Sequence, residues 1–262
     1  MPFLTRNGCN IAYMRKPAAW GMHADIVYLP GLTSNMHGEK ARELERFATR
    51  QLGCNFWALE YQGHGDSSPN FLECTLATWL ADVLQLVDSI GGQRQILVGS
   101  SLGGWLALHA ALQRPHLVQG LLLLAPAVDV SQHWEAAAQP AGVDAWGHDL
   151  LQLPSAYVQE GGIQVRRSLF EEASRHHLLL HTGQLEAVTC PATIMHSIRD
   201  DVVPLELVQR LSDELAASSR AFHIEMLPDG NHRLSREQDL QLMCRLLEQL
   251  MRRVLESSPA FG

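Results

Sequence analysis

Gly99-Ser100-Ser101-Leu102-Gly103-Gly104 joins a predicted strand to a predicted helix. The apolar run Gln95–Val98 precedes it, and Ser101–Gln113, apolar almost all round, follows it. A turn this sharp needs glycines because neighbouring side chains would collide. The helix N-terminus supplies free N–H groups and a positive dipole end, which favour negative charge on a reacting oxygen. The spacing G-x-S-x-G predicts Ser101 as a nucleophile, and the alternative is a glycine-rich packing turn.

Short apolar runs alternate with segments of helical periodicity on both sides of this turn. The runs predict strands over 26–29, 55–61, 95–98, 121–124, 193–195 and 222–227, with an edge strand over 11–14. The periodicity predicts helices over 39–52, 75–90, 101–113, 205–217 and 236–255. Most strands are continuous apolar runs, which is typical of strands covered on both faces. We therefore expect an α/β fold: a mostly parallel central sheet with helices on both faces.

Residues 129–189 interrupt this alternation. They contain a polar, helix-like run from Gln164 to His177 but no convincing strand. We predict a single domain over residues 1–262, in which 129–189 form an inserted cap over the strand ends. Trp134, Trp146 and Tyr157 are candidate substrate-binding residues for an acyl pocket, or else they form the core of the insertion itself.

A serine needs a base within hydrogen-bond reach to act as a nucleophile at neutral pH. His232 follows the last predicted strand and precedes the last helix, so a loop can carry it to Ser101. We therefore predict His232 as the base. The other histidines considered are His109, His116, His176, His177 and His223.

The base in turn needs a carboxylate that fixes its tautomer and stabilises the imidazolium. Asp200 follows the strand over 193–195 and is the preferred partner. Asp201 is expected to cap the helix that begins near Leu205. Asp201 and Asp129, which follows the strand over 121–124, stay open as alternative acids.

Two backbone N–H groups are expected to stabilise the tetrahedral intermediate. One is the amide of Leu102, directly after the nucleophile, and the other is the amide of Leu32 in the loop Pro30-Gly31-Leu32-Thr33. Gly31 allows this loop to approach Ser101 closely. The alternative is an ordinary turn at the end of a strand.

Composition excludes several classes of protein. The 262 residues are 46% hydrophobic, which is too much for a disordered chain, and no apolar run reaches the length of a membrane helix. The formal net charge of −8 argues against a nucleic-acid partner. Five scattered cysteines form no disulfide framework or metal spacing, so we expect no cofactor and no metal. Because no apolar leader opens the sequence, the expected location is the cytoplasm.

Further motifs resemble those of the α/β-hydrolase superfamily. The segment Tyr61–Ser67 resembles its glycine–histidine–glycine loop. The segment His196–Pro204 resembles its H-G-x-x-D-x-x-V-P acid loop, with Ser197 in place of the usual glycine. The resemblance covers nearly the whole chain.

A narrower resemblance is to the animal mitochondrial family of palmitoyl-protein thioesterases and acyl-glucuronide esterases. The matching segments are Gly99–Leu106, Leu108–Ala111, Arg114-Pro115, Pro154-Ser155-x-Tyr157, Glu172-Ala173, His176-His177 and Asp200-Asp201. This resemblance implies a serine hydrolase that cleaves S-acyl thioesters or carboxylic esters of a small molecule or an S-acylated protein. The alternatives are a carbon–carbon bond hydrolase or lyase, or a non-enzymatic binding protein with a vestigial site. No transit peptide is visible, so the mitochondrial location is not expected to carry over.

Overall fold

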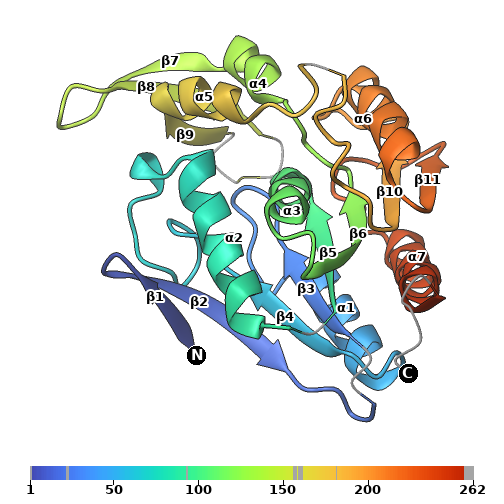
Figure 1. Cartoon of the computed structure of the whole chain (residues 1–262). Helices are drawn as coiled ribbons and strands as arrows, with labels where there is room; N and C mark the ends of the chain where they lie inside the picture. The colour runs from blue at the N-terminus through green and yellow to red at the C-terminus, as the bar shows by residue number, and fades with distance from the viewer. Residues whose placement is uncertain are drawn as a thin grey trace.

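The computed structural model describes residues 2–21, 24–92, 94–155, 158, 162–180 and 182–256 (Figure 1). Within these residues the central sheet has eight strands in the order β1-β2-β4-β3-β5-β6-β10-β11. They are β1 (Phe3–Arg6), β2 (Cys9–Lys16), β3 (Asp25–Leu29), β4 (Asn55–Leu59), β5 (Gln95–Ser100), β6 (Val118–Leu124), β10 (Ala192–Ser197) and β11 (Phe222–Leu227). The pairs from β4 to β11 are parallel, and β1 and β2 add an antiparallel edge.

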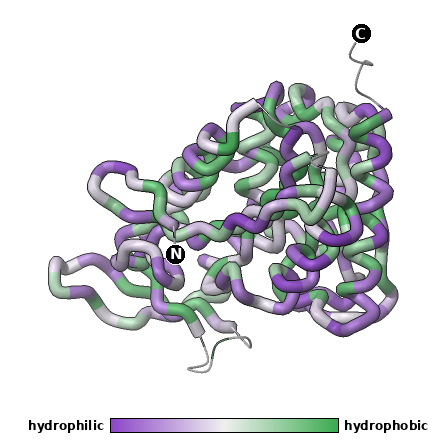
Figure 2. Tube along the Cα trace, turned by 90° about the horizontal axis from the view of Figure 1, so that it is seen from below, coloured by the Kyte–Doolittle hydropathy of each residue, from purple (hydrophilic) through white to green (hydrophobic). Residues whose placement is uncertain are grey.

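Helices cover both faces of the sheet, which confirms the predicted α/β architecture. On one face, α2 (Leu76–Ile90), α3 (Leu102–Gln113) and α6 (Leu205–Ser218) share a core with the sheet. On the other face, α1 (Glu39–Arg50) and α7 (Glu237–Glu256) form a second core. Hydrophilic and hydrophobic residues alternate along α7, the helix before the C-terminal trace (Figure 2). This pattern is expected for a helix with one buried stripe. Helix α3 differs, because Leu102 through Ala111 are all buried.

The segment between β6 and β10 departs from the prediction. It contains a second, antiparallel sheet of β7 (Gln139–Val143), β8 (Asp149–Pro154) and β9 (Gly162–Arg166). It also contains α4 (Ser131–Ala137), α5 (Ser168–Ala173) and the short 3₁₀ turn η2 (Ser174–His176). A further 3₁₀ turn, η1 (Phe71–Glu73), lies between β4 and α2. The expectation of no strand here is therefore wrong. The helix-like run over 164–177 is confirmed only in part, because its first residues belong to β9 and only α5 and η2 are helical.

The turn between β7 and β8 explains this hairpin. The Asp144 carboxylate accepts the N–H groups of Trp146 and His148, and Gly147 has a φ of 82°. An Asp and a Gly three residues apart are a turn signal, and here they join two strands too short to show a clear alternation.

Within the described ranges, no helix combines the length and apolarity that crossing a bilayer requires.

Candidate active site

The turn after β5 places Ser101 in a strained conformation at the start of α3. Its φ is 53°, in the left-handed region that non-glycine residues rarely adopt. A Cβ on Gly103 would overlap the Leu29 carbonyl oxygen, and one on Gly99 would overlap the Gly103 carbonyl oxygen. Both glycines are therefore required for the close contact between β3, β5 and α3 that holds Ser101 in place.

We expect Gly103→Ala to lower the free energy of unfolding by about 1–3 kcal/mol, because the added methyl overpacks the contact with β3. Gly92→Ala is the matched control, because a Cβ there meets nothing within 4 Å. It should change the free energy by less than about 0.5 kcal/mol. Urea unfolding of both variants measures the difference. Equal stability of the two would contradict the packing role of Gly103.

The structure brings Ser101, His232 and Asp200 into one hydrogen-bonded series. His232 Nε2 lies 2.9 Å from Ser101 Oγ, and His232 Nδ1 lies 2.8 Å from Asp200 Oδ2. Ser101 comes from the turn after β5, Asp200 from the loop after β10, and His232 from the loop between β11 and α7. Parallel strands bring these carboxyl ends to one edge of the sheet, which is why residues distant in sequence meet there.

Asp200 is held in its ionised form. Burial by itself raises the pKa of this carboxyl group, but hydrogen bonds from His232 and from the amides of Val203 and Val202 outweigh it and hold the pKa below its ordinary value. Those amides donate to Asp200 Oδ1 at 2.9 and 2.8 Å. An ionised carboxylate only accepts hydrogen bonds, so His232 Nδ1 is the donor and Nε2 is left to accept the Ser101 proton.

The two alternative acids lie elsewhere. The Asp129 carboxylate accepts the N–H groups of Leu178 and Leu179, at distances from 2.7 to 3.0 Å. It therefore ties the end of β6 to the chain that returns from the second sheet. Asp201 is exposed and lines the cavity above Ser101. The expectation that Asp201 caps α6 is wrong, since Pro204 occupies the N-cap position.

The other predicted histidines serve different parts of the fold. His177 Nε2 lies 2.7 Å from Ser131 Oγ. The His176 carbonyl is within hydrogen-bond distance of His109 Nε2 and accepts the Trp105 indole N–H. His223 pairs with Glu225, and His116 lies in the turn after α3.

The first two residues of the acid-loop motif make contacts that the sequence motif does not reveal. His196 is fully buried, with Nδ1 3.7 Å from Asp200 Oδ2, and neither ring nitrogen has a hydrogen-bond partner among the described residues. Burial lowers its pKa, although Asp200 opposes this, so the ring is neutral. Ser197, at the position where glycine is usual, donates its hydroxyl to the Gly230 carbonyl at 2.9 Å. It thereby joins the acid loop to the loop that holds His232.

The predicted oxyanion donors lie on both sides of Ser101. Leu102 opens α3, and Leu32 lines the same cavity as Ser101. A Cβ on Gly31 would be 3.3 Å from Ser101 Cβ, so the β3 loop approaches the serine closely. Within the part of the chain that the structure describes, neither the Leu32 nor the Leu102 amide has a hydrogen-bond partner. Both are therefore available to a substrate oxygen.

A cavity of about 680 Å³ opens above Ser101 and His232. The second sheet and its helices contribute Trp134, Leu153 and Ile163 to its wall. Trp146 does not reach this cavity: it is 72% exposed in the β7–β8 turn, where the Arg166 guanidinium lies 5.5 Å from its ring. Tyr157 lies outside the described residues.

The opposite wall of the cavity carries basic groups. Lys40 and Arg233 both line it, and Lys40 Nζ donates a hydrogen bond to the Arg233 carbonyl. Burial, followed by the nearby Arg233 charge, lowers the pKa of Lys40 to about 8. Within the described residues, no group of three or more His, Cys, Asp or Glu side chains is arranged to hold a metal ion.

A serine on a strand–helix turn, linked through histidine to aspartate at the carboxyl edge of a parallel sheet, is the arrangement of α/β hydrolases. The chain belongs to the alpha/beta hydrolase family, whose family model matches residues 26–244. Mouse "Palmitoyl-protein thioesterase ABHD10, mitochondrial" is 35% identical over 255 residues, covering 96% of this chain and 82% of the relative. The human protein of that name is 34% identical over 245 residues, covering 92% of this chain and 76% of the relative.

Solved structures agree with the fold. The structure of alpha/beta hydrolase domain-containing protein 10 from mouse matches with a TM-score of 0.81 and 32% identity, over 97% of this chain and 98% of that one. Est1E from Butyrivibrio proteoclasticus, solved with ferulic acid, has a TM-score of 0.80 over 98% of this chain and 100% of its own. Its identity of 17% shows a common fold only.

The expected cytoplasmic location is contradicted by these relatives. Those from mouse, cattle and human are each named as mitochondrial proteins. The expectation rested on the lack of an apolar leader, and this feature does not separate cytoplasmic from mitochondrial proteins, because mitochondrial transit peptides are amphipathic and not apolar.

Proposed function

We propose that this protein is a serine acyl hydrolase that cleaves S-acyl thioesters or carboxylic esters. The hydrogen-bonded series Ser101–His232–Asp200, with distances of 2.9 and 2.8 Å, carries the proposal. It lies at the floor of a cavity with an apolar wall, where an acyl chain can be bound. The relatives named palmitoyl-protein thioesterases support an acylated substrate.

Acylation begins when Ser101 Oγ attacks the acyl carbonyl carbon and its proton passes to His232 Nε2. Asp200 stabilises the resulting imidazolium through Nδ1. The Leu32 and Leu102 amides stabilise the negative oxygen of the tetrahedral intermediate. The bond from carbon to the leaving sulfur or oxygen then breaks, and His232 returns the proton to the leaving group. A thiolate leaves readily, so thioester cleavage needs little of this protonation.

Deacylation repeats the sequence with water as the nucleophile. His232 Nε2 takes a proton from the water while the hydroxyl oxygen attacks the acyl-serine carbonyl. Collapse of the second intermediate breaks the bond to Ser101 Oγ, which takes the proton back from His232. The products are a carboxylic acid and the free enzyme, and no cofactor is required.

We propose that residues 129–189 act as a cap within one domain over residues 1–262. Two polar contacts support this placement. The Glu172 carboxylate accepts the Ala77 N–H in the first turn of α2, and the His176 carbonyl accepts the Trp105 indole N–H from α3. The cap is therefore fastened to the core at both α2 and α3, while its Trp134 and Leu153 line the cavity.

A panel of substrates tests the proposed function. It compares p-nitrophenyl esters, acyl-CoA and S-acyl-cysteine peptides, each with acyl chains of increasing length. We expect hydrolysis of both ester and thioester. The kcat/KM should rise with acyl chain length, because a longer chain contacts more of the apolar wall of the cavity. A flat profile would contradict a long-chain deacylase, and no hydrolysis of any member would contradict an acyl hydrolase.

Trp134 and Trp146 form a matched pair for locating the acyl site. Trp134→Ala should reduce kcat/KM for long acyl chains about 10- to 100-fold, because an apolar contact of this size contributes about 1.5–3 kcal/mol, and should affect acetyl esters much less. Trp146→Ala removes an exposed ring outside the cavity and should leave both unchanged. Steady-state kinetics on the ester panel measures the contrast. Equal effects of the two substitutions would mean that Trp134 does not contact the acyl chain.

A further inference from the structure

The loop that carries the Leu32 amide is held on both sides by the glycine–histidine–glycine loop. The Tyr61 hydroxyl donates to the Pro30 carbonyl at 2.8 Å. Three residues further along, the Thr33 N–H donates to His64 Nε2 at 3.1 Å. These two bonds enclose Gly31 and Leu32, the residues that lie against Ser101.

The second bond holds a strained residue. Thr33 has a φ of 58°, and a β-branched side chain is unfavourable there. Such a conformation is strained and persists only where the surroundings impose it. Thr33 itself is exposed, so core packing does not impose it. Two hydrogen bonds fix its backbone: the turn bond from the Ser34 N–H to the Gly31 carbonyl at 3.0 Å, and the bond from the Thr33 N–H to His64, which anchors the turn to the neighbouring loop.

His64 is suited to this task because its ring is fixed and neutral. It is 5% exposed, and the rings of Tyr61, Phe71 and Trp79 contact it edge-on with centroids 5.4–5.6 Å away. Nδ1 lies 3.2 Å from the Gln62 carbonyl, which only accepts, so Nδ1 carries the proton and Nε2 is the acceptor. Burial lowers the pKa of His64 despite the opposing Gln62 bond, so the accepting form persists.

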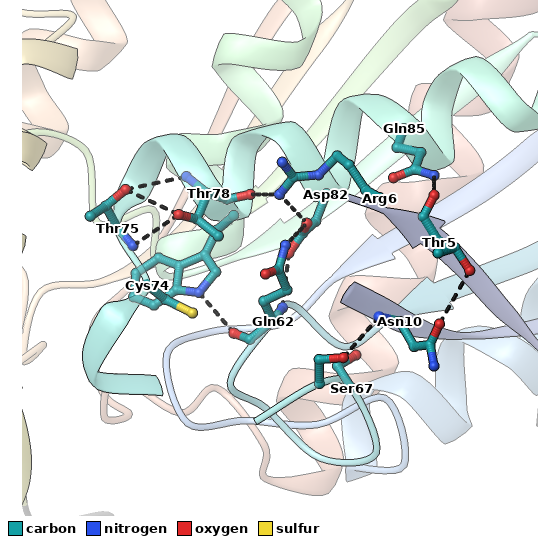
Figure 3. A network of polar contacts seen from close by, with 12 residues as sticks. Thr5, Arg6, Asn10, Gln62, Ser67, Cys74, Thr75, Thr78, Asp82 and Gln85 are labelled. Atoms are coloured by element: carbon teal, nitrogen blue, oxygen red, sulfur yellow. Dashed lines mark hydrogen bonds and ion pairs between the residues drawn. The ribbon is translucent and has the colours of Figure 1, made fainter. Parts of the chain in front are cut away.

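The support continues into the core. Both the backbone N–H and the side-chain amide of Gln62 donate to the Asp82 carboxylate, at 2.8 and 2.9 Å. Asp82 is fully buried on α2 and paired at 2.8 Å with Arg6 from β1, as Figure 3 shows. The Gln62 carbonyl also accepts the Trp79 indole N–H at 3.0 Å. Gln62, whose carbonyl accepts the proton of His64 Nδ1, is therefore itself fixed by hydrogen bonds to buried groups of α2.

We propose that His64 is a positioning residue of the oxyanion site: by accepting the Thr33 N–H, it keeps the Leu32 amide beside Ser101. This inference rests on the proposed function. It concerns a residue that neither donates to the substrate nor transfers a proton, and it gives the histidine of this loop a definite role in catalysis.

The test compares His64→Phe, which keeps a ring but no acceptor, with His64→Gln, which keeps an acceptor. We expect His64→Phe to lower kcat for p-nitrophenyl butyrate about 10- to 100-fold with KM within about twofold of the wild type, as for a misplaced oxyanion donor. Inhibition by a trifluoromethyl ketone, whose adduct with Ser101 needs the same donors, should weaken by the same factor. His64→Gln should recover most of both losses.

Hydrogen exchange of the segment 30–35 provides a readout independent of hydrolysis. It should accelerate in His64→Phe and stay near the wild-type rate in His64→Gln. If the wild type hydrolyses no substrate, the proposed function fails, yet the exchange rates still decide whether His64 holds the loop. If His64→Phe is too unstable to purify, His64→Met, similar in length to Gln but without a strong acceptor, replaces it. An unchanged kcat, or equal losses in the acceptor and non-acceptor variants, would overturn the inference.

Discussion

Ser101→Ala is expected to lower kcat for every ester and thioester substrate by about 10⁴-fold or more, because no other group can form the acyl-enzyme. The Ser101 hydroxyl is the atom that His232 Nε2 approaches to 2.9 Å. Removing it leaves the strained backbone of the turn in place, so thermal unfolding should be close to that of the wild type. Initial rates at saturating p-nitrophenyl butyrate measure the loss.

Ser100→Ala is the control for this substitution. Ser100 is the last residue of β5 and is buried, and its side chain is not part of the Ser101–His232–Asp200 series. We expect its kcat to stay within about tenfold of the wild type. Turnover by Ser101→Ala at or near the wild-type rate would show that the nucleophile is another group.

The second large effect concerns the acid. Asp200→Asn should lower kcat by about 10⁴-fold, because an amide in place of the carboxylate favours the wrong tautomer of His232 and no longer stabilises its charge. Asp129→Asn should keep kcat within about tenfold of the wild type. It should instead lower the free energy of unfolding by about 1–3 kcal/mol, since the charged acceptor for Leu178 and Leu179 is lost.

These two substitutions together separate catalysis from anchoring. Steady-state kinetics and urea unfolding on both variants give four values, and the prediction assigns the kinetic loss to one residue and the stability loss to the other. A kinetic loss in Asp129→Asn comparable to that in Asp200→Asn would contradict the assignment of the acid.

Much of the fold could be predicted because its strands carry strong local signals. Runs such as Ile26–Leu29 and Leu121–Leu124 are continuous and apolar, as strands covered on both faces require. The second sheet has no such signal: β7 reads Gln139-Pro140-Ala141-Gly142-Val143 and is mostly exposed. Its pairing depends on the Asp144 turn and on β8, so its sequence alone resembles a loop. The edge strand β1 also lacks a continuous apolar run, because only alternate residues of it are half-buried. The sequence analysis therefore does not predict it.

The candidate site could be predicted where residues follow strand ends. Ser101 directly follows β5, and Asp200 and His232 lie in the loops after β10 and β11; a parallel sheet brings such positions together. The residues that support them could not be predicted this way. His64 meets Thr33, 31 residues away in sequence, through a contact between two loops that no short spacing encodes. Trp146 shows the opposite error, because an aromatic residue in the insertion need not face the cavity.

Labelling with a fluorophosphonate probe, followed by peptide mapping, tests the central claim most directly. The probe phosphonylates a serine only when a neighbouring base activates it. We predict a single adduct on Ser101, together with loss of hydrolysis, and no labelling of the His232→Ala variant. An unlabelled Ser101 in an active enzyme, or an adduct on another residue that abolishes hydrolysis, would contradict the account. An unlabelled and inactive protein would instead indicate a vestigial site.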